Sequence, residues 1–156
     1  MSQTGHIFQI SVSRGGVPKR AIYHAQVDTL GVAGDQHRDM VHHGGPDRAV
    51  CLYSLEKILA LQTEGNPIFP GSAGENITLA GLDWETIVPG KRIRLGAEVL
   101  LEVTDYTTPC NNITGSFADA DSNRILEKTH TGWSRVYARV LQTGEVRIGD
   151  KAVVES

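Results

Sequence analysis

Cys110 is one of two cysteines in the chain, and its position suggests that its thiol is available for chemistry. It follows Pro109 at the end of a predicted strand, which places the thiol at a strand-to-loop junction. A thiol there can face a pocket, where a thiolate is a soft metal ligand or a carrier of sulfur. The alternative is a buried cysteine that packs as a small hydrophobic residue, an interpretation that suits Cys51 within its apolar run.

A second group of candidate ligands combines carboxylates and imidazoles within nine residues. Its members are Asp35, His37, Asp39, His42 and His43. Such side chains bind zinc or iron, but this spacing matches no standard site. The alternative is that they form hydrogen bonds that hold a glycine-rich loop rigid.

Two glycine-rich loops could place backbone N–H groups against a phosphate or a pterin edge. Their candidate residues are Gly44, Gly45, Arg48, Gly74, Glu75 and Asn76. The alternative is that the glycines only supply the positive φ angles of turns. Glu75 is either a general acid or base, or a residue that holds backbone N–H groups of its own loop.

The chemistry of these residues must be positioned by a small β-rich fold. The 156 residues fit one domain (residues 1–156), and the 17 glycines and 6 prolines imply many turns between short strands. The net charge of -3, with both signs mixed along the chain, disfavours a nucleic-acid surface. Because the chain shows neither an export signal nor a membrane-spanning run, we expect a cytoplasmic protein with free thiols and no membrane partner.

Alternating hydrophobic residues predict most of the secondary structure. The expected strands cover residues 6–12, 21–27, 49–53, 75–79, 91–95, 99–103, 135–141 and 146–154. The strands at 91–95 and 99–103 should form a hairpin, and those at 135–141 and 146–154 should form another pair. Together these strands predict a closed or partly open β-barrel with short helices.

Two short helices are also predicted. Ser54 can cap the first, which should place Leu55, Ile58, Leu59 and Gln62 along one side. The second should cover residues 118–128. Residues 31–47 are too polar to pack in a core and are predicted to form one long loop.

Taken together, five blocks of sequence resemble the MOSC family, which is named for the C-terminal domain of molybdenum cofactor sulfurases and includes small stand-alone bacterial proteins. The blocks are residues 31–37, 43–50, 70–77, 109–110 and 144–150. The resemblance implies a β-barrel of the MOSC and pyruvate kinase type. It also implies that Cys110 lies in a cleft, as a molybdenum ligand or a sulfur carrier.

The resemblance assigns the surrounding blocks to the molybdenum cofactor, molybdopterin. The candidate cofactor-binding residues are Asp35, His37, His43, Gly44, Gly45, Arg48, Gly74, Glu75, Asn76 and Pro109. One position departs from the family pattern, because relatives often carry an arginine shortly before the cysteine and this chain reads YTTPC at residues 106–110. Either another residue such as Arg48 or Arg139 meets the cofactor phosphate, or the ligand is held differently, or there is none.

Three functions stay open at this point. The first is a reductase of N-hydroxylated small molecules, with molybdenum held by Cys110. Its electrons would come from a partner reductase, because the chain has neither a dinucleotide fingerprint nor the cysteines for an iron–sulfur cluster. The second is a carrier in which Cys110 accepts persulfide sulfur from a cysteine desulfurase, with pyridoxal phosphate belonging to that partner. The third is a non-catalytic module that holds or delivers the cofactor.

Overall fold

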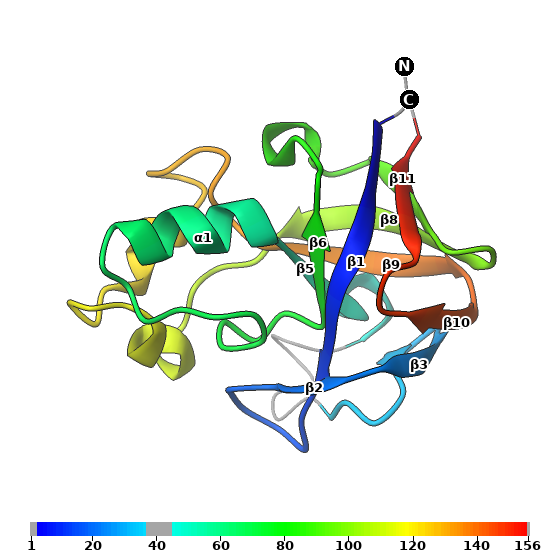
Figure 1. Ribbon diagram of the computed structural model, residues 1–156, viewed down its shortest axis with the longest axis horizontal. Helices are drawn as coiled ribbons and strands as arrows, with labels where there is room; N and C mark the ends of the chain where they lie inside the picture. Colours follow the sequence, from blue (N-terminus) through cyan, green and yellow to red (C-terminus); the bar gives the residue numbers. More distant parts are fainter. Residues whose placement is uncertain (1–2, 37–44, 156) are drawn as a thin grey trace.

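A computed structural model describes residues 3–36 and 45–155 and confirms the mostly β prediction. Seven strands form a closed barrel, because β11 (Lys151–Val154), at one end of the sheet, pairs with β1 (Gln3–Val12) (Figure 1). In order around the barrel they are β1, β6 (Ile77–Ala80), β5 (Val50–Ser54), β9 (Val136–Gln142), β8 (Val99–Tyr106), β7 (Arg92–Leu95) and β11. Closure leaves these strands without a free edge.

A smaller sheet and one added strand lie beside the barrel. The strand β2 (Arg20–Ile22) extends the sheet at the far end of β1. The small sheet has the order β10 (Gly144–Arg147), β3 (His24–Asp28) and β4 (Gly31–Val32). The predicted strand at 21–27 is therefore divided between two sheets, and the predicted loop at 31–47 begins with a two-residue strand.

The helix α1 (Leu55–Thr63) connects β5 to the parallel strand β6, as a crossover must. Ser54 caps it as predicted, since its Oγ accepts a hydrogen bond from the Lys57 N–H at 3.1 Å. Ile58 and Leu61 are buried, whereas Leu59 is 49% exposed, so the prediction that Leu59 lies on the inner side was wrong. The inner face is set by the three-residue step between Ile58 and Leu61.

The barrel interior is filled by the alternating residues of its strands. The predicted hairpin is confirmed, since β7 and β8 pair antiparallel with Leu95 opposite Val99. Their inward residues Ile93, Leu95 and Leu101 are fully buried. This alternation is the period-two pattern that the sequence displays.

Two predictions fail for reasons of long-range pairing and local hydrogen bonding. β9 pairs with β5 and β8, while β10 leaves to pair with β3, so residues 135–141 and 146–154 do not form a pair. The predicted helix at 118–128 is the short 3₁₀ helix η4 (Ser122–Ile125). There Asp119 and Asp121 accept hydrogen bonds from the backbone N–H groups of residues 121 and 123, which competes with a regular helix.

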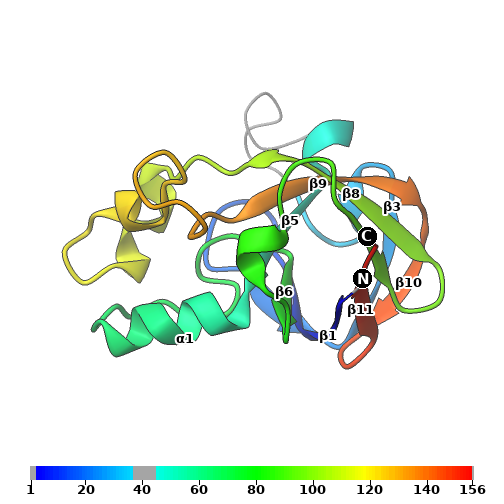
Figure 2. The ribbon, with the colours of Figure 1, turned by 90° about the horizontal axis from the view of Figure 1, so that it is seen from above.

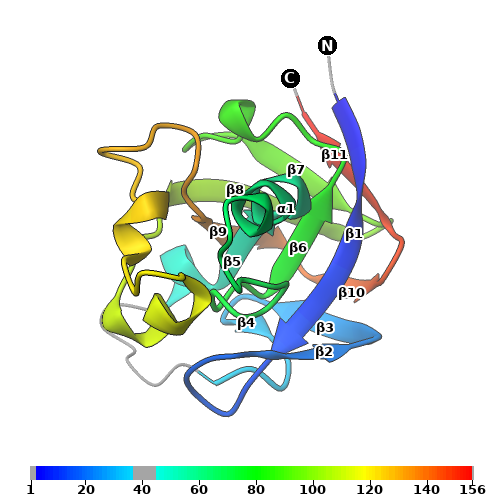
Figure 3. The same cartoon turned by 60° about the vertical axis from the view of Figure 1, so that its left-hand side comes forward.

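The helix α1 and the segment from η3 (Asn111–Ser116) to η4 lie on the same side of the barrel (Figure 2). The remaining 3₁₀ turns are η1 (Pro46–Arg48) and η2 (Trp84–Thr86). The β1–β2 loop, the loop before β6 and the η3–η4 segment gather at the end of the barrel away from the two termini (Figures 1 and 3). Among the described residues, no helix is long and apolar enough to cross a membrane.

Candidate functional site

A cavity of about 160 Å³ lies where these loops meet the barrel wall. Its lining comes from the β1–β2 loop, the glycine-rich loop before β6, the strands β5 and β9, and η3. The lining residues that carry functional groups include Lys19, Cys51, Asn76, Cys110, Arg135 and Tyr137. Residues far apart in the sequence therefore meet in one place.

Cys110 immediately precedes η3, and its thiol is partly exposed. It lines the cavity together with Gly74 and Asn76, so the structure brings the predicted cysteine to the predicted glycine-rich loop. Pro109 precedes it but is not among the cavity lining. A thiol in this place can bind a group that enters the cavity.

The second cysteine also lines the cavity. Cys51 in β5 stands directly opposite Tyr137 in β9, and both are absent from the core cluster that contains their neighbours Leu52 and Val136. Side chains directly opposite each other on antiparallel strands lie on the same face, which here is the cavity face. Burial raises the pKa of the Cys51 thiol, so this second thiol is held in its neutral form.

A buried polar network holds one wall of the cavity. The Asp35 carboxylate accepts hydrogen bonds from Lys19 Nζ at 2.7 and 2.8 Å and from Asn76 Nδ2 at 2.8 Å. Asn76 also accepts a hydrogen bond from the Cys51 N–H at 3.0 Å and donates one to the Ser11 carbonyl at 3.3 Å. Because the side-chain amide of Asn76 already has these protein partners, its role is to position the wall.

The glycine-rich loop approaches the β1–β2 loop so closely that a side chain would clash. Gly71 has φ +91°, and a Cβ there would lie 2.6 Å from the Lys19 carbonyl oxygen. Gly74 has φ +83° and faces Val17. Both glycines therefore meet the conformational need of a tight turn, and Gly74 also lines the cavity.

Glu75 lies behind this loop and is fully buried. Its Oε2 accepts a hydrogen bond from the Thr78 hydroxyl at 3.1 Å, and it is not part of the cavity lining. Burial raises the pKa of the Glu75 carboxyl, which favours its neutral form. The structure therefore places Glu75 in the core behind the glycine-rich loop and not in the cavity lining.

Arg135 is a cavity residue that sequence reasoning missed. Its side chain is buried, with the residue 4% exposed, and Nη1 donates a hydrogen bond to the Ala73 carbonyl at 2.6 Å. Within residues 3–36 and 45–155, Nε and Nη2 have no hydrogen-bond partner. The absence of an arginine before Cys110 suggests that another residue supplies the cation. The sequence does not show which one, because a lone arginine just before β9 matches no motif.

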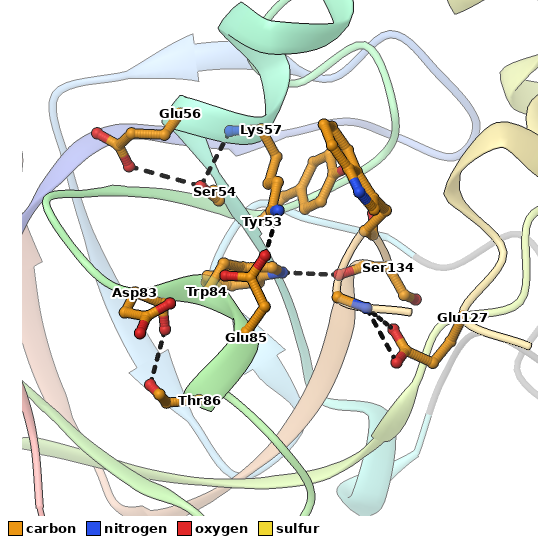
Figure 4. A network of polar contacts seen from close by, with 12 residues as sticks. Tyr53, Ser54, Glu56, Lys57, Asp83, Trp84, Glu85, Thr86, Glu127 and Ser134 are labelled. Carbon is orange, nitrogen blue, oxygen red and sulfur yellow. Dashed lines mark hydrogen bonds and ion pairs between the residues drawn. The ribbon is translucent and has the colours of Figure 1, made fainter. Parts of the chain in front are cut away.

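The segment before Arg135 is held by a network of hydrogen bonds, here called the Trp133 clamp, made by residues 132–134 and their partners (Figure 4). The Trp133 carbonyl accepts from the Tyr53 hydroxyl at 2.6 Å, and the Ser134 carbonyl accepts from Trp84 Nε1 at 2.8 Å. The Gly132 N–H donates to both carboxylate oxygens of Glu127 at 3.1 Å. These bonds fix the backbone from which Arg135 reaches the cavity.

The other arginines proposed for a phosphate lie elsewhere. Arg48 lies over the Tyr137 ring, with 5.6 Å from its Cζ to the ring centre, and does not line the cavity. Arg139 has a 44% exposed side chain and forms ion pairs with Asp47 and Glu102. Neither arginine is part of the cavity lining, and their assignment to a phosphate stays a prediction.

Several predicted ligands fall outside the described residues, namely His37, Asp39, His42, His43 and Gly44. Gly45 precedes η1 with φ +92° and is not part of the cavity lining, and Asp35 is bound to Lys19. Within the ranges 3–36 and 45–155, no three His, Cys, Asp or Glu side chains group closely enough to hold a metal ion. The predicted zinc or iron cluster stays a prediction.

Comparison with known proteins places this fold and sequence in one family. The MOSC domain model matches residues 39–153. YflK of Bacillus subtilis is 35% identical over 117 residues, which are 74% of this chain and 52% of that protein. A protein of Gibberella moniliformis named "Reductase" is 33% identical over 148 residues, 87% of this chain and 26% of its own length. YiiM of Escherichia coli is 33% identical over 113 residues, 67% of this chain and 48% of its own. The chain thus spans about half or less of these relatives.

Solved structures share the fold. The YUAD protein of Bacillus subtilis superposes with a TM-score of 0.79 at 18% identity, over 100% of this chain and 98% of that one. YiiM of Geobacillus stearothermophilus superposes with a TM-score of 0.70 at 26% identity, over 100% of this chain and 76% of that one. These superpositions confirm the predicted type of barrel.

Proposed function

Because this chain belongs to the MOSC domain family, we propose that it binds a molybdenum cofactor in the cavity, with the Cys110 thiolate as the protein ligand of the metal. One observation carries the proposal. Cys110, which is partly exposed, and the buried guanidinium of Arg135, whose Nε–H and Nη2–H have no partner among the described residues, line the same cavity. The thiolate is a soft ligand suited to molybdenum, and the guanidinium suits an anionic group such as a phosphate.

The cavity residues fit such a group in three respects. Cys110 presents sulfur, and Arg135 presents two N–H donors without protein acceptors. The network of Asp35, Lys19 and Asn76 keeps the opposite wall rigid, so a ligand meets a preformed surface. Preorganised donors of this kind bind without the cost of ordering side chains.

The cofactor, when bound, supplies two-electron redox chemistry, and the protein contributes binding, orientation and exclusion of water. Cys110 would hold the metal, and Arg135 would offer its N–H groups to an anionic group of the cofactor. Cys51 and Tyr137, both buried, form a weakly polar face of the cavity. Burial raises the pKa of the Tyr137 hydroxyl, so it stays protonated and able to donate a hydrogen bond.

We propose that the activity is reduction of N-hydroxylated small molecules in the cytoplasm. The relative named "Reductase" supports reductive chemistry, although this chain spans only 26% of it. Electrons would come from a reductase outside these 156 residues, because they contain no dinucleotide fingerprint and no cysteine set for an iron–sulfur cluster. The proposal includes no nucleic-acid or membrane partner.

Metal and pterin analysis tests the proposal. The protein is purified from molybdate-fed cells that make the cofactor, as wild type, Cys110→Ala and Asn111→Ala. Asn111 is exposed and adjacent to Cys110 but does not line the cavity, so it is a matched control. We expect stoichiometric molybdenum and pterin in wild type and Asn111→Ala, with the metal lost in Cys110→Ala. The holoprotein should then reduce an N-hydroxylated base when an electron donor is added.

Other results would replace this function. Wild-type protein without molybdenum would overturn it. If Cys110 then gains the mass of one sulfur with a cysteine desulfurase, the protein is a sulfur carrier, and pyridoxal phosphate belongs to the desulfurase. Bound molybdenum without reduction would leave a cofactor-binding module. Zinc that is lost on changing His37 or His42 and kept in Cys110→Ala would place a metal in the 35–43 loop.

A further inference from the structure

Arg135 carries a positive charge in the interior with no counter-charge in contact. Its Nη1 binds the Ala73 carbonyl, a neutral acceptor, and its remaining nitrogens Nε and Nη2 have no partner among the described residues. Removing an arginine from water without pairing its charge is strongly unfavourable. Such an arrangement is expected where a ligand completes it.

The carboxylates near the cavity do not neutralise this charge. Within the described residues, none lines the cavity. Asp35 is bound to Lys19, which removes one cation and one anion together. Glu75 forms no ion pair with Arg135 within 4 Å; burial raises the pKa of its carboxyl, and the charge of Arg135 offsets part of that rise. The described part of the cavity wall therefore has an excess positive charge at Arg135.

The two free nitrogens lie on the same edge of the guanidinium. Nε–H and the Nη2–H next to it point in the same direction, and this edge is a fork that accepts two oxygens of one oxyanion. The third nitrogen, Nη1, is fixed by Ala73, so the plane of the fork is set before a ligand arrives. Bidentate pairing of this kind is typical of carboxylate and phosphate recognition.

Arg135 also lies beside the segment that leads to Cys110. The Thr107 N–H donates a hydrogen bond to the Arg135 carbonyl at 2.9 Å, so residue 135 is hydrogen-bonded to that segment. Arg135 and Cys110 both line the cavity. The buried cation and the thiol therefore reach the same space from neighbouring segments.

We propose that Arg135 binds the phosphate group of a phosphate monoester in this cavity. The Nε–H and Nη2–H groups donate to two phosphate oxygens, and the anion neutralises the buried charge. The proposal rests on the proposed function in one respect, namely that the molecule carrying the phosphate group is the pterin cofactor. The same fork accepts inorganic phosphate.

The first arm of the test uses purified, cofactor-free protein with inorganic phosphate at constant ionic strength. The readouts are the rate of Cys110 alkylation by iodoacetamide, assigned by peptide mass, and the thermal midpoint. In wild type, phosphate should slow alkylation and raise the midpoint. In Arg135→Met, phosphate should bind about 10- to 100-fold more weakly, the loss expected for a charge-assisted pair. Arg139→Met removes an exposed arginine of the same strand and should respond as wild type.

The second arm measures pterin and phosphate that copurify from molybdate-fed cells with the same variants. Loss in Arg135→Met with retention in Arg139→Met supports the proposal in either arm. An effect confined to the second arm assigns the site to a phosphate on a larger ligand. An effect confined to the first arm, with no pterin in wild type, leaves the anion site standing while the proposed function fails. Arg135→Met that equals wild type in both arms overturns the proposal.

Arg135→Lys keeps the charge but loses the fork, so it protects the test against a folding defect of Arg135→Met. We expect phosphate binding weaker than in wild type in this variant as well. Unchanged binding in Arg135→Lys would show that a point charge suffices and would overturn the bidentate geometry.

Discussion

Trp133 and Arg135 are two residues apart, yet their electrostatic surroundings differ. The two cations that lie over the Trp133 ring are paired with carboxylates, whereas Arg135 is a cation without such a partner among the described residues. Lys57 and Arg124 each lie 4.1 Å from the Trp133 ring centre, and each is also bound to a carboxylate at 2.7 Å. Arg124 leaves one nitrogen without a partner, but its charge is matched. Arg135 is more deeply buried and has no matching charge among the described residues. The two cations on Trp133 are thus paired with carboxylates, whereas Arg135 has no such partner among the described residues.

Removing the indole of Trp84 should break the clamp that separates these two environments. Trp84 is buried against Tyr53, and its Nε1 holds the Ser134 carbonyl. We expect Trp84→Ala to lower the free energy of unfolding by about 3–5 kcal/mol in urea titrations and to weaken phosphate protection of Cys110. Trp84→Phe, which keeps most of the volume, should show a smaller loss. Full stability in Trp84→Ala would mean that the clamp is not needed.

Neutralising each arginine in turn should give stability changes of opposite sign. In phosphate-free buffer, Arg124→Met loses an ion pair and a ring contact and should destabilise by about 1 kcal/mol. Arg135→Met removes an uncompensated buried charge and should stabilise by about 1–2 kcal/mol despite losing the bond to Ala73. Phosphate should reduce that gain by stabilising the wild type. Strong destabilisation by Arg135→Met without phosphate would show a structural role instead.

Two carboxylates, one buried near Arg135 and one paired with Lys57, should give the free energy of unfolding opposite dependences on pH. Burial raises the pKa of Glu75 above its ordinary value of 4.5, so its stabilisation is complete below that value and is lost as pH rises through the folded pKa. The hydrogen bond from Lys57 lowers the pKa of Glu85, so its stabilisation is present above the ordinary value and is lost as pH falls through the folded pKa.

Urea unfolding from pH 3 to pH 8 checks both directions. Glu75→Gln should remove a downward slope of up to about 1.4 kcal/mol per pH unit above pH 4.5. Glu85→Gln should remove a smaller dependence on the acid side, because its ion pair is largely solvated. An unchanged slope in Glu75→Gln would mean that Glu75 is ionised and is a counter-charge for Arg135.

The smallest expected effect comes from a single hydroxyl of the clamp. Tyr53→Phe removes the donor to the Trp133 carbonyl and should cost about 1 kcal/mol. The ring contact with Trp84 stays, so phosphate binding should change little. A large loss of phosphate binding would show that this one bond controls Arg135.

Local patterns in the sequence located most of the barrel but not its strand partners. The β7–β8 hairpin was predictable because its strands are adjacent and alternate cleanly around Gly96. β10 was assigned to the wrong partner because alternation marks a strand without saying which distant strand it joins. The prediction of a helix at 118–128 is wrong because two aspartates there accept hydrogen bonds from nearby backbone N–H groups. The spacing of hydrophobic residues does not reveal these local bonds.

The candidate site, like the barrel, could be predicted from the sequence only in part. Cys110, Gly74 and Asn76 belong to recognisable blocks, and the structure brings them to one cavity. Arg135 and Lys19 have no motif, and their burial depends on Ala73 and Asp35, which come from other parts of the chain. The position of a lone arginine becomes meaningful only when its missing partners are seen.

The pairing of β1 with β11 joins the first and last strands of the barrel. During synthesis the ring therefore stays open until the final strand has left the ribosome, and β1 and β7 expose pairing edges until then. β1 also leads at its far end into the loop that carries Lys19 to the cavity. A truncation that removes β11 would free the paired end of β1, whose other end leads to the cavity, so β11 supports a cavity that it does not line.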